Sequence, residues 1–250
     1  MAKPALHFQR FEFKYYLPKN TANKLIPALL SHMSWDPYIK NSSYDFYQVN
    51  SLYFDSPNYG CFWDKESGLA DRKKLRLRFY NQLSDSESPI FLEVKRKKDA
   101  LVIKDRIPLE LKDAANGVLD SKLSSLAKQN ESNDFLKELI WFKKSNSLRP
   151  KLFVTYKRQA LIGKLDKKFR VTFDYDVKTQ LISSLVHPLN KLKEVYPEGV
   201  VLELKYNNIL PFWFQEIIQK YQLQRLAYSK YCNSLRRVLP QLDDHNYSVI

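Results

Sequence analysis

Cysteine is scarce in this sequence. The 250 residues include two, Cys61 and Cys232, which lie far apart and form no CxxC pair. The four histidines supply no partners at the spacing of a zinc finger. The sequence therefore predicts neither a disulfide framework nor a structural zinc site, and a reducing compartment is expected.

Long apolar runs are also missing. Residues Met1 to His7 lack the continuous apolar core of a signal peptide. No stretch comes near the roughly 20 apolar residues that a membrane-spanning helix needs. We therefore expect a soluble, cytoplasmic protein.

The motifs of the common nucleotide-binding folds are absent. There is no Walker-type phosphate loop, no glycine-rich dinucleotide turn and no HExxH zinc motif, which excludes those sites. The five glycines are scattered, and no linker rich in Gly, Pro or Ser divides the chain. We expect residues 1–250 to form a single domain.

Positive charge is abundant. Lys and Arg number 41 against 27 Asp and Glu, a formal net charge of +14. Such an excess indicates an anionic partner, but charge alone leaves nucleic acid, an acidic membrane surface, nucleotides and inorganic phosphates open. The distribution of the charges must decide between them.

Much of the chain alternates charged and apolar side chains with a period of two, which is typical of strands with two different faces. Strands are predicted at 10–15, 47–54, 74–79, 92–97, 101–108, around 156–158, at 169–176 and at 200–206. The turn-like segment 81–89 predicts a hairpin between the third and fourth of these strands.

Helices are expected in three places. Within 113–146, apolar residues from Phe135 to Phe142 recur at helical spacing. Pro211 suits the first turn of a helix that runs to about Tyr221. Ser229 is a good N-cap for a final helix over 230–238.

The charged faces of the strands favour an enclosed anion site. On a single strand, charges most often face solvent. Here, however, Arg recurs at alternate positions, as in Arg76 and Arg78, and Arg is the bidentate phosphate ligand. We expect an α+β fold: an antiparallel closed β-barrel, with these faces inward around a phosphate tunnel and amphipathic helices packed outside.

The acids on the charged strand faces, and the start of the last helix, each allow a functional and a purely structural interpretation. The acids in these rows, Glu12, Glu93, Asp174 and Glu203, could hold a divalent cation or form salt bridges with neighbouring cations. Glu203 is the preferred ligand because it lies between two leucines in an apolar strand. The helix start at Ser229 and Lys230 suits either an anion or simple capping.

Taken together, these segments resemble the VTC domain family, the polyphosphate polymerase domain within the triphosphate tunnel metalloenzyme superfamily. The matching segments, spread over nearly the whole chain, are 10–15, 51–55, 74–78, 92–95, 156–158, 170–174, 202–205 and 229–230. The resemblance implies a barrel whose lumen binds triphosphate or polyphosphate, with ATP as donor and Mn²⁺ or Mg²⁺ as cofactor.

The resemblance also implies roles for individual residues. As catalytic phosphate clamps it gives Arg76, Arg78, Lys95, Arg158, Arg170 and Lys230. As substrate-binding residues we add Lys14, Arg10, Lys74, Tyr156, Ser229 and the weaker match Arg106. As metal ligands we take Glu203 first, then Glu93, Glu12 and Asp174.

The sequence departs from its wider superfamily at the first strand. Tunnel triphosphatases and cyclases typically open with ExExK, whereas this chain has Arg10 in place of the first acid. That difference favours the VTC branch and weakens a hydrolase interpretation. The SPX sensor and membrane helices of the eukaryotic complexes are missing, so we expect the domain to stand alone or to recruit a separate membrane protein.

The leading hypothesis is therefore a polyphosphate polymerase that takes ATP and inorganic polyphosphate or pyrophosphate as substrates. A metal-dependent triphosphatase is the first alternative. A non-catalytic module that binds polyphosphate or nucleic acid is the second. Specific nucleic acid is the weakest partner, because no recognition helix or RNP-type aromatic strand is found.

Overall fold

The computed structural model describes residues 7–40, 45–80, 90–114, 118–184, 189–207 and 209–244. Its strands are β1 (His7–Pro18), β2 (Met33–Trp35), β3 (Tyr47–Asp55), β4 (Arg72–Tyr80), β5 (Ile90–Lys98), β6 (Leu101–Leu109), β7 (Arg149–Gly163), β8 (Arg170–Leu181), β9 (Lys193–Glu194) and β10 (Gly199–Tyr206). The predicted strands lie within these, except that β8 begins at Arg170, one residue after the predicted start at Phe169, and the predicted turn at 81–89 lies outside the described residues.

The helices separate groups of strands. They are α1 (Lys19–Leu30), α2 (Pro37–Lys40), α3 (Gly60–Glu66), the 3-10 turn η1 (Leu111–Ala114), α4 (Val118–Gln129), α5 (Asp134–Ser145), α6 (Phe212–Lys220), α7 (Lys230–Val238) and α8 (Gln241–Asp244). The final-helix prediction is confirmed, since the Ser229 hydroxyl caps α7 by accepting from the Cys232 amide. Pro211 is the N-cap of α6 rather than its first residue.

The strands form a closed antiparallel barrel. Its order is β7-β3-β4-β5-β6-β1-β10-β8, and β8 pairs back with β7. The short strands β2 and β9 extend the sheet beside β7 and β8. The charged faces of the strands point into the barrel, where Glu93, Asp174, Arg158 and Glu203 are buried, so the predicted α+β barrel is confirmed.

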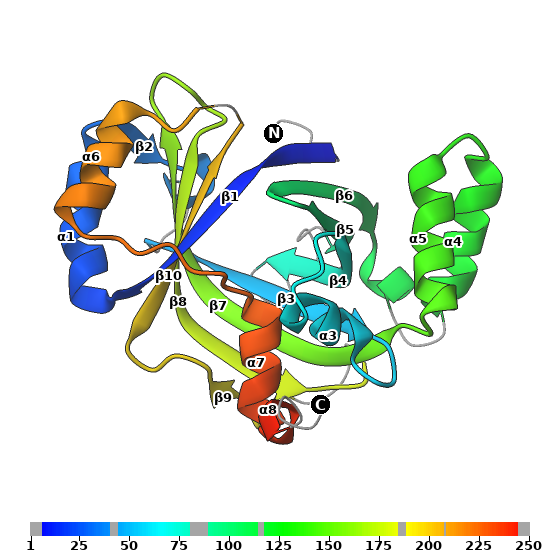
Figure 1. Ribbon diagram of the computed structural model, residues 1–250. Helices are drawn as coiled ribbons and strands as arrows, with labels where there is room; N and C mark the ends of the chain where they lie inside the picture. The colour runs from blue at the N-terminus through cyan, green and yellow to red at the C-terminus, as the bar shows by residue number, and fades with distance from the viewer. Residues whose placement is uncertain are drawn as a thin grey trace.

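Two helical layers cover the apolar outside of the barrel (Figure 1). The α4–α5 hairpin packs Leu123 and Leu139 against Leu77 and Leu92 of the β4–β5 hairpin. On the other side, α1 and α6 cover β1, β8 and β10. No helix in the described part of the chain is both long and apolar enough to cross a bilayer.

One helix lies on the inner face instead. Tyr231, Cys232 and Leu235 of α7 pack against Val154 and Tyr156, which share the inward face of β7 with Arg158. The helix therefore closes the apolar end of the lumen, and its N-terminus begins where the charged residues begin. The sequence predicted the helix but not this inward position.

Asp55 at the end of β3 holds this helix in place. Its carboxylate accepts the backbone N–H groups of Ser56, Cys61 and Phe62, at 2.7, 2.8 and 3.2 Å. It also accepts the hydroxyl of Tyr231. The side chain is 0% exposed, so one buried anion joins β3, the start of α3 and α7.

We predict that Asp55→Ala lowers the free energy of unfolding by about 3 kcal/mol, because it leaves several buried donors without an acceptor. Tyr231→Phe removes a single hydrogen bond and is expected to cost about 1 kcal/mol. Urea unfolding of each variant measures the change. The exposed Asp71 is the matched control, and an Asp55→Ala loss no larger than that of Asp71→Ala would contradict this role.

Candidate functional site

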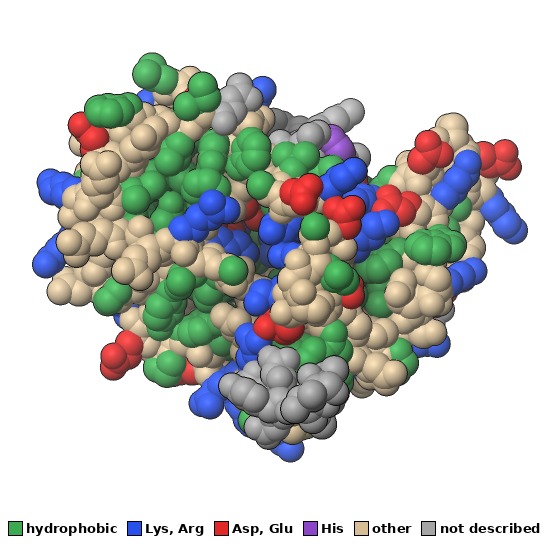
Figure 2. Space-filling view, in the orientation of Figure 1, with side chains coloured by type: hydrophobic (Ala, Val, Ile, Leu, Met, Phe, Trp, Pro, Cys, Tyr) green, Lys and Arg blue, Asp and Glu red, His purple; other side chains and the backbone are tan. Residues whose placement is uncertain are grey.

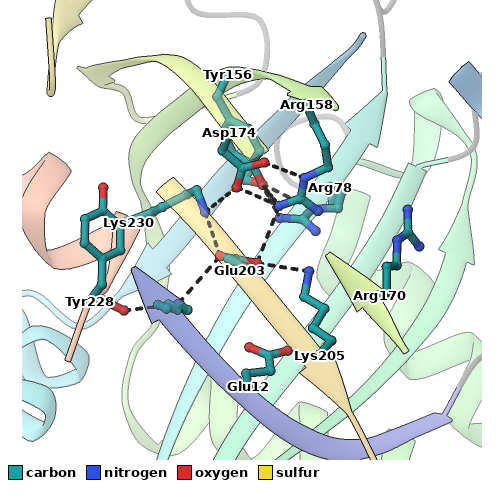
Figure 3. A network of polar contacts seen from close by, with 12 residues as sticks. Glu12, Arg78, Tyr156, Arg158, Arg170, Asp174, Glu203, Lys205, Tyr228 and Lys230 are labelled. Atoms are coloured by element: carbon teal, nitrogen blue, oxygen red, sulfur yellow. Dashed lines mark hydrogen bonds and ion pairs between the residues drawn. The ribbon is translucent and has the colours of Figure 1, made fainter. Parts of the chain in front are cut away.

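The centre of the lumen contains two carboxylates that share one ammonium. Lys230 Nζ lies 2.5 Å from Asp174 Oδ2 and 2.6 Å from Glu203 Oε1 (Figure 3). Asp174 comes from β8, Glu203 from β10 and Lys230 from the first position of α7. Two strands and a helix that lie far apart in the sequence therefore meet at this point.

More cations surround these acids than the acids can neutralise. Lys205 Nζ lies 3.0 Å from Glu203, and Lys14 Nζ lies 3.7 Å from it while donating to the carbonyl of Tyr228 at 3.0 Å. Arg158 binds both oxygens of Asp174, at 2.6 and 2.8 Å. All of these groups are buried or half-buried, so water screens their charges weakly.

A second cluster is centred on Glu93 of β5. Arg76 approaches its Oε2 to 2.8 Å and Lys104 approaches its Oε1 to 3.0 Å. Arg106 lies 3.7 Å away and Arg78 3.9 Å. Glu93 is 0% exposed, and its oxygens are shared among these four cations.

Arg78 differs from its neighbours. It is 6% exposed, yet its close partners are neutral hydroxyls: Ser51 at 3.3 Å and Tyr156 at 3.1 Å. The nearest carboxylate in an ion pair is Glu93, at 3.9 Å. A guanidinium desolvated in this way has strong capacity to bind an anion bidentately.

The remaining predicted residues line the same lumen or its openings. Glu12 binds Lys95 at 2.5 Å and Arg10 at 3.4 Å. Arg170 reaches Asp36 at 2.7 Å and the Tyr47 hydroxyl at 3.1 Å. Lys74 contacts the Ser229 hydroxyl at 3.3 Å.

The structure thus brings the predicted basic and acidic residues together, while their roles stay predictions. Lys205 and Lys104 were missed as site residues, although both stand in the alternating rows: Lys205 two residues after Glu203, and Lys104 two before Arg106. The period-two pattern could have found them. Asp36 and Tyr47 hold Arg170, but the period-two pattern of charged residues did not identify either of them as a site residue.

The electrostatics of the acids follow from their surroundings. Burial alone would raise the pKa of Glu203, but Lys230, Lys205 and Lys14 outweigh burial and hold that pKa well below its usual range. Arg158 and Lys230 do the same for the pKa of Asp174. Both acids are therefore ionised at neutral pH.

The pKa values of three luminal lysines are lowered too, which for a lysine disfavours the charged form. Burial lowers the pKa of Lys104 to about 7, and the nearby Arg78 and Arg76 reinforce it against the opposing charge of Glu93. Burial lowers the pKa of Lys14 to about 8 and that of Lys205 well below its usual value. Burial thus destabilises these ammonium groups, and an added anion would favour their charged forms.

Metal binding needs hard oxygen ligands in a group. Within the described ranges, no cluster of three or more His, Cys, Asp or Glu is placed to hold a metal. Asp174 and Glu203, however, share one cation between their carboxylates. That arrangement fits an ion held by one or two carboxylates and completed by phosphate oxygens, rather than an all-protein cage.

The strands close into a barrel around an enclosed, basic lumen. The VTC domain family matches residues 9–239. The chain belongs to that family, which confirms the resemblance drawn from its motifs. A search of curated proteins finds no match.

Several solved structures are similar to this chain at low sequence identity. A candidate adenylate cyclase from Bacillus halodurans has 14% identity and a TM-score of 0.51, covering 90% of this chain and 96% of that one. A protein from Pyrococcus horikoshii has 12% identity and a TM-score of 0.46, with 94% and 99% covered. The mimivirus capping enzyme triphosphatase has 13% identity and a TM-score of 0.36, with 85% and 87% covered.

We predict that the ligand-free protein becomes more stable as the pH rises from about 7 to 9. Unfolded Lys104 keeps its proton up to its ordinary pKa of 10.5, whereas folded Lys104 releases it near pH 7. The unfolded state therefore binds more protons in this range, and the free energy of unfolding increases with pH.

Denaturant unfolding at several pH values tests this dependence. In Lys104→Met the increase is expected to be smaller by about 1 to 2 kcal/mol than in wild type. Lys128→Met, on the exposed face of α4, is the matched control and should keep the wild-type slope. A Lys104→Met profile parallel to that of wild type would show that Lys104 titrates normally.

Proposed function

We propose that this protein is a polyphosphate polymerase. It transfers the terminal phosphoryl group of ATP to the end of a polyphosphate or pyrophosphate chain held in the barrel. The bond from the γ-phosphorus to the β–γ bridging oxygen breaks, and a bond to a terminal oxygen of the chain forms. ADP leaves, and the chain is one phosphate longer.

The observation that carries the proposal is Arg78. It is a buried guanidinium, its closest partners are hydroxyl groups, and Arg76 lies beside it on the same face of β4. A bound phosphate would supply the charge that Ser51 and Tyr156 cannot. Membership of the VTC domain family supports the same ligand.

The lumen suits phosphoryl transfer without a general base. The acceptor is an oxyanion with no proton to remove, so catalysis needs positioning and charge stabilisation. Arg78, Arg158 and Lys230 are 6% exposed each, and they converge from β4, β7 and α7. Their burial excludes water, which would otherwise accept the phosphoryl group.

A divalent cation, Mg²⁺ or Mn²⁺, is part of the proposal. Bound at Glu203 and Asp174, it would neutralise charge on the phosphate oxygens. Glu203 and Asp174 lie together on Lys230, and we rank Glu93, which belongs to the separate cluster of Arg76 and Lys104, as a weaker ligand. Glu12 is tied to Lys95 and Arg10, so we place it outside the ligand set.

Arg10 supports polymerisation over triphosphate hydrolysis. Its Nε lies 3.4 Å from Glu12, so a basic group stands where an acid opens the first strand of tunnel triphosphatases. The substitution removes a negative charge from the lumen and adds a positive one. That exchange favours binding of a second, highly charged phosphate chain beside ATP.

The product assay is the direct test. Purified protein, ATP and Mn²⁺ or Mg²⁺ are expected to yield polyphosphate, faster with a pyrophosphate primer, as measured by gel electrophoresis and ADP release. Phosphate release without polymer would identify a triphosphatase instead. Tight polyphosphate binding with no turnover, unchanged by EDTA, would identify a binding module.

We predict that Arg78→Met lowers kcat/KM for ATP by at least about 100-fold, because it removes a desolvated charge from the phosphate site. Tripolyphosphate binding, measured by calorimetry, should weaken in the same variant. Arg149→Met, an exposed arginine at the start of β7, is the matched control. Equal activity of the two variants would exclude Arg78 from the site.

A further inference from the structure

A basic cluster lies where the charged rows leave the lumen. Arg72 of β4 and Lys97 of β5 are paired in register. The next inward-facing pair along these strands is Lys74 and Lys95, two residues further on each strand, or about 7 Å. The luminal row of cations therefore continues outward to Arg72 and Lys97 without a break.

Arg225 joins this cluster from another part of the chain. The segment 223–229, which leads from α6 to α7, crosses β1 in Figure 1 and forms a bridge from Arg225 to Tyr15. The Leu226 amide also donates to the Lys14 carbonyl at 2.9 Å. The Arg225 guanidinium stacks on Phe13, 3.7 Å from the ring centroid, and the residue is exposed. Stacking fixes the plane of the guanidinium and leaves its N–H edge open.

The acids near the outer cluster (Arg72, Lys97 and Arg225), Asp99 beside Lys97 and Asp64 beside Arg72, lie farther away than the acids that accompany the luminal cations. Among the described residues none of the three forms an ion pair, and Arg72 donates to the Leu69 carbonyl. Burial, then Arg72 and Arg225, lower the pKa of Lys97, while Asp99 opposes them. Three cations at the edge of a basic lumen thus repel one another. Figure 2 shows Lys and Arg side chains gathered around the hollow at the centre of this face.

We propose that the outer cluster is a binding subsite for the part of a polyphosphate chain that extends out of the barrel. The inference rests on the proposed function and adds chain-length selectivity to it. A triphosphate fills the luminal positions alone, whereas a longer chain also reaches Arg72, Lys97 and Arg225. Inorganic polyphosphate fits better than single-stranded nucleic acid, because Phe13 is covered by Arg225 and offers no open ring for base stacking.

The test compares short and long chains. Affinities for tripolyphosphate and for polyphosphate of about 60 units are measured by fluorescence anisotropy competition in wild type and in the double variant Lys97→Gln, Arg225→Gln. We expect the long chain to bind about tenfold more weakly in the variant, with a shallower salt dependence, because fewer counterions are released. Tripolyphosphate affinity should stay within about twofold, since screening limits the reach of the lost charges.

The control carries the same change of net charge. Lys128→Gln, Lys144→Gln removes two exposed lysines from the α4–α5 hairpin and should leave both affinities unchanged. Equal weakening of short and long chains in the Lys97, Arg225 variant, or no weakening of either, would overturn the subsite. So would an oligothymidine that competes as well as long polyphosphate and loses affinity in step with it. Wild-type protein that binds no polyphosphate of any length would instead contradict the proposed function.

Discussion

Cations buried inside a closed barrel must find negative charge, and this constraint governs the rest of the structure. Desolvating an ammonium or guanidinium is costly unless an anion lies beside it. Glu203 and Asp174 meet that requirement around Lys230, and Glu93 meets it around Arg76 and Lys104. These acids do not neutralise the whole lumen. Burial lowers the pKa values of Lys14 and Lys104, and the neighbouring cations lower them further against Glu203 and Glu93.

The fold holds this unfavourable arrangement together by placing the charged and the apolar side chains on opposite faces of the barrel wall. The apolar faces point outward, where α1, α6 and the α4–α5 hairpin cover them. Burial of these apolar side chains stabilises the folded state and offsets the cost of burying charges in the lumen. The α7 helix closes the apolar end of the inner face. Asp55 anchors that helix through Tyr231, the residue next to Lys230, so it supports the position of the helix start that carries Lys230.

The barrel could be predicted because its rule is local: a period of two in 74–79 or 200–206 assigns each side chain to a face without knowledge of its neighbours. The pairs across the lumen could not be predicted, since Lys230 meets Asp174 through chain closure rather than through sequence spacing. The inward position of α7 depends on an apolar patch that only the folded β3, β7 and β8 create. The α1 helix was missed as well, and Pro27 interrupts its sequence signal.

The same constraint explains why the acids in the lumen are few and shared. Each carboxylate that pairs with a luminal cation stabilises the barrel but also competes with phosphate for that cation. A lumen with every cation paired in this way would be stable but would bind phosphate weakly. Lys230 is held at once by Asp174 and Glu203, whereas the close partners of Arg78 are hydroxyl groups. In the proposed function a phosphate chain would therefore gain more at Arg78 than at Lys230, where it would have to displace a carboxylate. Displacing that carboxylate would leave it without a cation. The proposed divalent cation, bound at Asp174 and Glu203, would take the place of Lys230 as their partner and so offset this cost.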